Sequence, residues 1–173
     1  MSEKDIQERM QAEEGWKELI FPKEYGIGQS FVGGDNSSKR LIVKYFIRKA
    51  DKRFFAKVYF GELAQGPPSH AHGGSMAAVL DEAMGLAAWA ANYSAVAAKI
   101  TIEYVAMLPL NTVTIVETWV ENTEGRKVWM RGEIKNEDGK VFSKGEGLYV
   151  SLPIEKFGNE GFHHKMKKQI DSL

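Results

Sequence analysis

Residues 66–91 read GPPSHAHGGSMAAVLDEAMGLAAWAA, and the fold of the chain can be worked out from this stretch. It begins with the turn residues Gly66-Pro67-Pro68, passes two histidines and a glycine pair, and continues into a segment rich in alanine, leucine and methionine. That composition, with apolar residues recurring at helical spacing, predicts a helix with Ser75 as a candidate N-cap. Because the helix is apolar almost all round, we expect it to be buried.

Two acidic residues, Asp81 and Glu82, lie in the middle of this helix. A carboxylate in a buried helix is costly unless it is paired, hydrogen-bonded or facing a wet cavity, so the pair indicates a site. At the start of the helix, the first backbone N–H groups have no intrahelical partner and the helix dipole is positive. Gly73 and Gly74 carry no side chain, so a ligand can approach these groups closely. They form a candidate oxyanion hole, which acyl transfer from a thioester would use.

The spacing of these groups favours a site shared between two chains. Asp81 follows Gly74 by seven residues, which is roughly 10 Å along a helix axis at ~1.5 Å per residue. A base acting through one water must lie within two hydrogen bonds of the reacting carbon. One chain is therefore not expected to place both groups on one carbonyl. We expect a composite site at a homodimer interface, in which Asp81 of one copy faces Gly73 and Gly74 of the other.

Each of these residues also has a plain structural interpretation. A glycine pair before a helix is often only a turn, His72 can be a hydrogen-bonded structural residue, and His70 is expected to be an exposed loop residue. Glu82 lies one step round the helix from Asp81 and competes with it for the catalytic role. Four large residues are candidates for lining an acyl pocket but are more simply explained as core residues, namely Met76, Met84, Trp89 and Tyr93.

The rest of the chain is predicted to be mostly β-structure. Residues 2–19 favour an amphipathic surface helix, and residues 22–39 favour an irregular connection. The predicted strands are residues 41–48, 54–60, 99–104, 112–121, 128–136 and 140–152, with a type I′ turn at Asp138-Gly139. We divide the chain into an N-terminal helical extension (1–24), a central domain (25–153) and a polar C-terminal tail (154–173).

The order of two strands, one long buried helix and four further strands predicts an α+β fold. Only one helix is apolar enough to cover a sheet, so the economical arrangement is a curved antiparallel sheet of about six strands wrapped round that helix. This is the hotdog fold, with the N-terminal helix on its surface. A single layer leaves a sheet edge open, which predicts a homodimer, or a homotetramer built as a dimer of dimers.

Length and composition exclude several classes of function. A chain of 173 residues fits one domain, and 23 basic against 23 acidic side chains give no electrostatic footprint for nucleic acid or a charged membrane. The absence of cysteine excludes thiol catalysis, disulfides and cysteine zinc sites. No apolar run is pure enough to span a bilayer, and the acidic N-terminus lacks signal-peptide character. We expect a soluble cytoplasmic protein without metal, cofactor, nucleic-acid partner or membrane insertion.

His72-Gly73-Gly74, six further residues and Asp81 form a pattern that resembles the PaaI-like hotdog thioesterases. The chain resembles the mammalian THEM-type acyl-CoA thioesterases more closely. The flanking residues 66–68 and 124–127 match as well, and the spacing from residue 72 to residue 110 is ungapped. The resemblance covers roughly residues 25–152 and implies hydrolysis of fatty-acyl-CoA or aryl-acyl-CoA thioesters.

The resemblance also implies roles for the residues of the pattern. The acid at Asp81 would act as a nucleophile or as a general base on water. A backbone N–H at Gly73 or Gly74 would polarise the thioester carbonyl, and His72 would help to hold the loop.

The predicted substrate-binding residues are Arg126, Lys127, Ser75 and Glu82. In the resemblance, the Gly-Arg-Lys turn is where such folds can meet the phosphates of CoA, which enters as part of the substrate. A solvated hairpin turn explains Arg126 and Lys127 equally well.

Two positions depart from the pattern of this family. The THEM-type enzymes carry a threonine that assists the acid from the neighbouring subunit, and the aligned residue here is Ala97, which cannot form such a hydrogen bond. Ser94 and Thr101 are candidate substitutes. The family also has a basic pair after a strand tyrosine, where residues 104–106 read Tyr-Val-Ala. Both departures bear on substrate and rate but not on fold.

Three functions remain open, with a metal-free acyl-CoA thioesterase as the leading one. A hotdog hydratase or dehydratase would need His72 and Asp81 within reach of one substrate carbon. A non-catalytic acyl- or acyl-CoA-binding protein would use the same fold without turnover, and Ala97 is the residue that best supports it.

Overall fold

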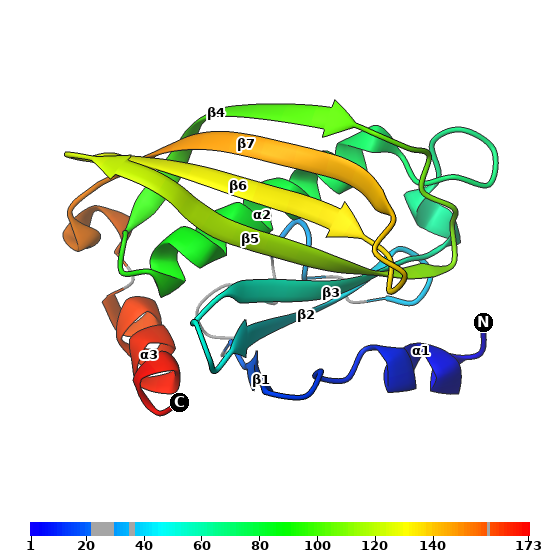
Figure 1. The fold of residues 1–173 in the computed structure, drawn as a ribbon, viewed down its shortest axis with the longest axis horizontal. Coiled ribbons are helices and arrows are strands. Elements are labelled where there is room, and N and C mark those ends of the chain that lie inside the picture. Colours follow the sequence, from blue (N-terminus) through cyan, green and yellow to red (C-terminus); the bar gives the residue numbers. More distant parts are fainter. Residues whose placement is uncertain (22–29, 35–36, 159) are drawn as a thin grey trace.

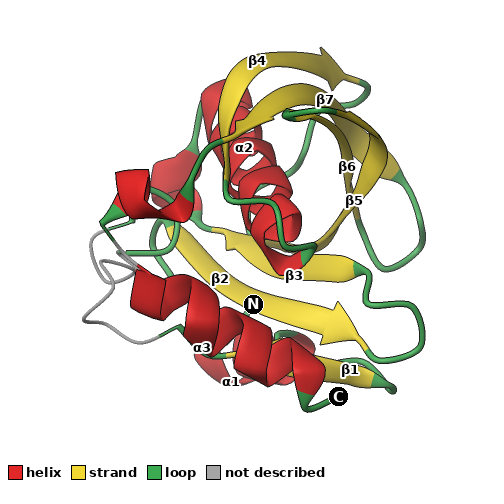
Figure 2. Cartoon of the chain, turned by 90° about the vertical axis from the view of Figure 1, so that its left-hand side faces the viewer, coloured by secondary structure: helices red, strands yellow, loops and turns green. Residues whose placement is uncertain are grey.

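In the computed structural model, which describes residues 1–21, 30–34, 37–158 and 160–173, seven antiparallel strands form one curved sheet round a long helix, α2 (Figures 1 and 2). The strands are β1 (Trp16–Leu19), β2 (Leu41–Arg48), β3 (Phe54–Phe60), β4 (Ala95–Tyr104), β5 (Thr112–Glu124), β6 (Lys127–Lys135) and β7 (Val141–Ser151). The helices are α1 (Glu3–Arg9), α2 (Gly73–Ala90) and α3 (Glu160–Asp171), with short 3₁₀ helices at Glu62–Ala64 and Ile154–Phe157.

The sheet order is β1-β2-β3-β5-β6-β7-β4, so β4 lies at the edge and not between β3 and β5. Among the described strands it pairs with β7 alone, with Ala97 opposite Tyr149 and Tyr104 opposite Ser143. Most of its residues are exposed, including Val96 at 43% and Tyr104 at 53%. This is the open edge that the sequence predicted.

Close packing of α2 on the sheet depends on inward-facing glycines of β6 and β7. A Cβ atom added at Gly132 would lie 3.0 Å from a Leu80 methyl carbon, and one added at Gly145 would lie 3.1 Å from the Met84 methyl carbon. Leu80 and Met84 are both 0% exposed. The glycines therefore let the helix approach the sheet where larger residues would hold it off.

The buried helix begins earlier than predicted. Its first residue is Gly73, and its N-cap is His72 rather than Ser75. The glycine pair thus forms the first turn of α2 and is not a turn that precedes it. The prediction of a buried central helix is confirmed.

The predicted N-terminal surface helix is confirmed, but it occupies only the first part of residues 2–19. Helix α1 ends at Arg9, and Trp16–Leu19 form β1, which extends the sheet beyond β2. Gly15 has φ +76, which interrupts a helix. Trp16 then stacks on Phe55 with ring centroids 4.1 Å apart, and this contact favours an extended segment. The sheet therefore has seven strands where about six were expected.

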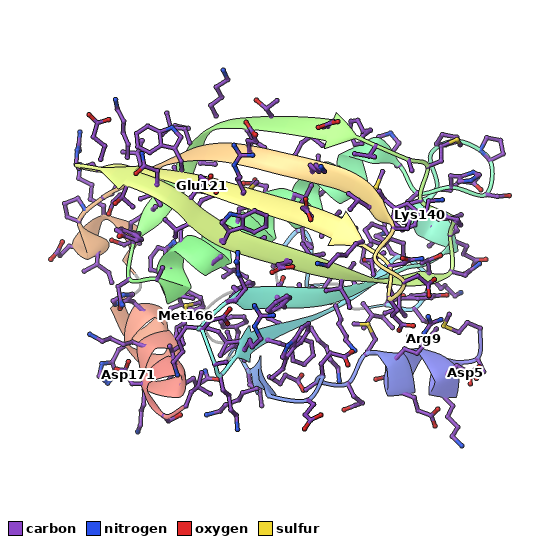
Figure 3. The ribbon with its side chains drawn as sticks, viewed as in Figure 1. Asp5, Arg9, Glu121, Lys140, Met166 and Asp171 are labelled. Atoms are coloured by element: carbon purple, nitrogen blue, oxygen red, sulfur yellow. The ribbon has the colours of Figure 1, made fainter. Side chains whose placement is uncertain are left out.

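Helix α1 covers the outer face of the sheet with a small second core. Ile6 and Met10 are buried there with Ile42, Tyr59 and Val113. Arg9 lies below the β6–β7 turn, and its guanidinium donates to Glu137 at 3.0 Å (Figure 3). In that turn only Gly139 has a positive φ, so the predicted type I′ turn, which needs two such residues, does not form.

The C-terminal tail docks as helix α3 beside the end of α2. Met166 is 1% exposed, and Phe162 lies edge-on to Trp89 with ring centroids 5.8 Å apart. The tail was predicted to be a surface helix or a frayed end, and the structure gives it a packed apolar face.

The division of the chain at residues 24, 153 and 154 stays a prediction. The first boundary, the predicted start of the resemblance at residue 25 and part of the predicted connection at residues 22–39 fall outside the described residues. Within the described part, no helix combines the length and hydropathy that crossing a bilayer requires.

Candidate active site

The loop before α2 is fixed by backbone contacts that require glycine at its start. The N–H of His72 donates to the carbonyl of Ala64 at 2.7 Å, and the N–H of Ala71 donates to that of Leu108 at 2.8 Å. A Cβ atom added at Gly66 would lie 2.7 Å from the Cα atom of His72, which is closer than real structures allow. Gly66 therefore lets the loop pass close to His72. The side chain of His70 stays in the loop, with its Nδ1 2.9 Å from the carbonyl of Pro68.

His72 caps α2 through its side chain. The Gly74 N–H donates to His72 Nδ1 at 2.8 Å, so the ring must be in the tautomer with an unprotonated Nδ1. A Cβ atom added at Gly74 would lie 2.9 Å from this nitrogen, so glycine is needed for the ring to reach the backbone. The N–H of Gly74 is thus occupied within the chain.

Gly73 has the N–H group of the glycine pair that remains available. It donates to no residue in the described part of the chain. Its carbonyl accepts a hydrogen bond from the Tyr104 hydroxyl at 3.0 Å, and a Cβ atom added here would lie 3.1 Å from the tyrosine ring. Both residues line a pocket of about 310 Å³, together with Met76 and Met107. Of the predicted oxyanion donors, Gly73 fits the role better than Gly74.

Asp81 lies exposed on α2, with its carboxylate held from one side. The hydroxyl of Tyr149 is 3.0 Å from Asp81 Oδ1 and 3.0 Å from the Asp81 carbonyl oxygen. Tyr149 is itself 1% exposed. Asp81 opens onto a pocket of about 380 Å³ that Leu86, Trp89, Ala97 and Phe162 also line. An acid at the rim of a largely apolar pocket is suited to act on an apolar substrate with a polar reacting group.

Burial raises the pKa of the Tyr149 hydroxyl well above its usual range, and the negative charge of Asp81 raises it further. The same two causes, with Glu82 as the charge, raise the pKa of Tyr45. Both hydroxyls therefore stay protonated at neutral pH and act as hydrogen-bond donors to the adjacent acids.

Glu82 lines the same pocket as Asp81, but it has partners for both carboxylate oxygens. Tyr45 donates to Oε1, and the hydroxyl of Ser30 donates to Oε2 at 2.6 Å. Ser30 also accepts from the N–H of Gly33 at 3.1 Å, so Glu82 anchors a turn of the preceding connection. This contact set gives Glu82 a structural use, and Asp81 is the acid with an oxygen, Oδ2, to which no described residue donates. A role for Glu82 in substrate binding stays a prediction.

The two ends of the candidate site are well separated in one chain. Gly73 and Asp81 are eight residues apart on α2, about 12 Å along its axis. The strand register agrees, because Gly73 contacts Tyr104 at one end of β4 and Asp81 contacts Tyr149, which pairs with Ala97 towards the other end. His72 and Asp81 are further apart still, so one chain does not bring them to a common substrate carbon.

The other predicted binding residues lie at both ends of the site. The hydroxyl of Ser75 donates to the carbonyl of His72 at 2.7 Å. Arg126 and Lys127 lie exposed at the β5–β6 turn, and the Arg126 carbonyl accepts from the N–H of Ser151 at 2.8 Å. Ser151 pairs with Ala95, so this turn lies at the Asp81 end of the sheet. No cluster of three or more histidine, aspartate or glutamate side chains suited to a metal occurs within the described ranges.

Neither candidate substitute for the missing threonine is placed to assist Asp81 in the same chain. The hydroxyl of Ser94 donates to the carbonyl of Leu152 at 2.6 Å. Thr101 lines grooves with Arg131 and Glu146, away from the Asp81 pocket. Ala97 lines the Asp81 pocket, where its methyl side chain offers no hydrogen bond.

Sequence reasoning missed the three tyrosines that contact the glycine pair and the acids. Tyr104, Tyr149 and Tyr45 come from three different strands, and their contacts with α2 span 31, 68 and 37 residues. The sequence did contain a signal for Tyr149. It follows Gly145 and Gly147 at a spacing of two, which places all three residues on the same, inward face of the strand. The residues predicted to line an acyl pocket have different surroundings. Trp89 lines the Asp81 pocket and Met76 lines the Gly73 pocket, whereas Met84 is a core residue. Tyr93 packs at the edge of that core.

Residues 69–143 match the family model described as the thioesterase superfamily. This segment, which is less than half of the chain, is similar to that superfamily. The match includes the His72-Gly73-Gly74 loop, all of α2 with Asp81, and the strands β4 to β6. The resemblance predicted from the sequence is confirmed.

Curated proteins that are similar to this chain are named acyl-coenzyme A thioesterases. The chain is 31% identical to THEM4 of Xenopus laevis over 108 residues, which are 62% of this chain and 49% of that protein. It is 26% identical to THEM5 of Mus musculus over 116 residues, which are 66% of this chain and 47% of that protein. The chain thus spans about half the length of the curated relatives it matches.

Solved structures confirm the hotdog fold. A thioesterase-superfamily protein matches with a TM-score of 0.59 and 30% identity, over 62% of this chain and 55% of the other. The PaaI protein of the E. coli phenylacetic acid degradation operon matches with a TM-score of 0.56 and 17% identity, over 58% and 73% of the two chains. A Streptococcus pneumoniae thioesterase protein solved with coenzyme A matches with a TM-score of 0.59 and 16% identity, over 64% and 88%.

The cap on α2 gives a first prediction. His72→Ala removes the acceptor of the Gly74 N–H and should lower the free energy of unfolding by about 0.5–2 kcal/mol. His72→Asn keeps a cap acceptor and should lose only a small part of that. Urea unfolding followed by circular dichroism measures both values. Equal losses for the two variants would show that the ring stabilises the loop by packing and not by capping.

Proposed function

We propose that this chain is an acyl-CoA thioesterase that hydrolyses a fatty-acyl or aryl-acyl thioester to the free acid and CoA. The observation that carries the proposal is the placement of Asp81, which is exposed at the rim of a largely apolar pocket and held there by Tyr149. The match to the thioesterase superfamily and the similarity to acyl-coenzyme A thioesterases support the same reaction.

The proposed site is composite and belongs to two copies of the chain. The N–H of Gly73 is available, but it is about 12 Å along α2 from Asp81 of the same chain. Pairing along the open β4 edge would bring a second copy of α2 antiparallel to the first. Asp81 of one copy would then meet Gly73 of the other, as a homodimer or within a dimer of dimers. The exposed apolar residues on β4 support that pairing.

In the proposed reaction, the Gly73 N–H donates to the thioester oxygen as it gains negative charge. Asp81 either attacks the carbonyl carbon or takes a proton from a water that attacks it. In both cases the C–S bond breaks, the CoA sulfur leaves and is protonated, and water supplies the oxygen of the product acid. His72 holds the loop through Gly74, and this leaves Gly73 as the donor.

The acyl group of the substrate would occupy the pocket beside Asp81, and the CoA phosphates would meet Arg126 and Lys127 at the same end of the sheet. Trp89 and Phe162 make two walls of this pocket aromatic. Phe162 belongs to α3, outside residues 69–143.

A location in the cytoplasm remains a prediction.

Each of the two alternative functions is judged on one observation. The hydratase or dehydratase interpretation loses support, because His72 Nδ1 already accepts from the Gly74 N–H as the cap of α2. The interpretation as a non-catalytic acyl-binding protein retains Ala97 in its favour. An assay for released thiol on a panel of acyl-CoAs separates it from the thioesterase, since binding without turnover releases no thiol.

Replacing the acid tests the assignment of Asp81 against Glu82. Asp81→Asn should lower kcat/KM by about 10²- to 10⁴-fold, because it removes the base or nucleophile and keeps the size of the side chain. Glu82→Gln is the paired variant and should keep most of the activity. Released CoA thiol gives both rates. An active Asp81→Asn enzyme beside an inactive Glu82→Gln enzyme would transfer the role to Glu82.

Shortening the aromatic wall tests the acyl pocket. Phe162→Ala enlarges the pocket and should shift the preferred acyl chain towards longer or bulkier groups, with KM for the previously preferred substrate raised about 10-fold. Lys167→Ala, also on α3 but exposed, is the matched control. The measurement is kcat/KM against acyl chain length. An unchanged profile in Phe162→Ala would place the acyl group elsewhere.

A further inference from the structure

The ring of Tyr149 lies flat along β7 because the strand leaves room for it. A Cβ atom added at Gly147, two residues earlier on the same face, would lie 2.5 Å from a ring carbon of Tyr149. Gly85 of α2 adds space on the other side, where a Cβ atom would come only into ordinary contact at 3.7 Å. The fold thus contains a slot, between Gly147 of the sheet and Gly85 of the helix, that directs the tyrosine hydroxyl towards Asp81.

The hydroxyl in this slot has two acceptors and one proton. It lies 3.0 Å from Asp81 Oδ1 and 3.0 Å from the Asp81 carbonyl oxygen. A bond to the carbonyl alone would stabilise α2 and nothing more. A bond to Oδ1 fixes the rotation of the carboxylate, and the other oxygen, Oδ2, has no donor among the described residues. The two bonds predict different results when the hydroxyl is removed: loss of the bond to the carbonyl would lower stability alone, whereas loss of the bond to Oδ1 would also lower activity.

We propose that Tyr149 is a positioning residue for Asp81, which holds Oδ1 of the carboxylate so that Oδ2 is presented to the thioester or to the attacking water. Tyr149 on β7 pairs with Ala97 on β4 in the sheet register. The hydroxyl donor to Asp81 therefore comes from the strand beside Ala97, whose side chain cannot donate a hydrogen bond. The inference rests on the proposed function and adds a residue to it.

The chain contains an internal comparison for this role. Tyr45 on β2 donates to Glu82 as Tyr149 on β7 donates to Asp81, and the two acids are consecutive on α2. Both tyrosines are buried, at 6% and 1% exposure. Tyr45→Phe and Tyr149→Phe therefore remove the same kind of hydrogen bond from the same helix. Both acids line the pocket, but both oxygens of Glu82 have donors, whereas Oδ2 of Asp81 has none among the described residues.

The experiment compares the two phenylalanine variants on the acyl-CoA that the wild type hydrolyses best. Tyr149→Phe should lower kcat about 10- to 100-fold with KM within about threefold of the wild type, because an acid that rotates freely is less often in the reactive orientation. Tyr45→Phe should keep kcat within about threefold. In an Asp81→Asn background, Tyr149→Phe should add no further loss, since the two residues act through one group.

Gly147→Ala provides a second variant that keeps the hydroxyl but displaces the ring. It should reproduce the kcat loss of Tyr149→Phe while retaining the secondary structure measured by circular dichroism. If Tyr149→Phe lowers the melting temperature but has the same kcat as Tyr45→Phe, the hydroxyl serves only the Asp81 carbonyl and the proposal is overturned.

A measurement without turnover separates this inference from the proposed function. A wild type that releases no thiol from any acyl-CoA would overturn the thioesterase assignment. The ¹³C NMR signal of the Asp81 side-chain carboxyl would then decide the role of Tyr149. Movement of that signal in Tyr149→Phe but not in Tyr45→Phe supports the positioning role, and an unmoved signal in Tyr149→Phe overturns it.

Discussion

The rigid separation of two groups on one helix constrains everything else in this site. Gly73, which has the available N–H, opens α2, and Asp81 lies eight residues along it. A helix cannot bend back on itself over that length, so the two groups face different regions of space. The curved sheet enforces the separation, because Tyr104 and Tyr149 hold the two positions towards opposite ends of the β4–β7 pair. A reaction that needs both groups therefore needs a second copy of the helix, and the open β4 edge is where that copy can add.

The site also depends on contacts from the sheet to the helix. Asp81 and Glu82 are neighbours in sequence with opposite surroundings. Glu82 is used on both oxygens to hold the Ser30 turn and β2, whereas Asp81 is held on one side and left open on the other. The buried tyrosines keep their protons and so donate to both acids. A polar pair in an otherwise apolar helix is thereby divided into an acid with donors to both oxygens and an acid with one oxygen open.

Much of the fold could be predicted because its signals are local. The strands at residues 41–48 and 54–60 and the buried central helix follow from short-range patterns of apolar residues. The errors arise where long-range packing decides. Trp16 becomes part of a strand because Phe55 offers it a stacking partner, and α3 docks because Trp89 accepts Phe162. His72 replaced Ser75 as the N-cap because Gly74 lets an imidazole reach the backbone. The family pattern drew attention to Asp81 and the glycine pair, but Tyr149 lies 68 residues from Asp81 in the sequence and has no local link to it.

The composite site is tested most directly by combining two defective chains. Asp81→Asn and Gly73→Val, co-expressed with different tags, can be purified as a heterodimer and assayed for released thiol. The valine side chain at position 73 would press on Tyr104, which is half-exposed and can move, so both chains should fold. One of the two sites in the heterodimer then combines an intact Asp81 with an intact Gly73, and about half of the wild-type activity should return. A heterodimer no more active than either parent would contradict a site shared between chains.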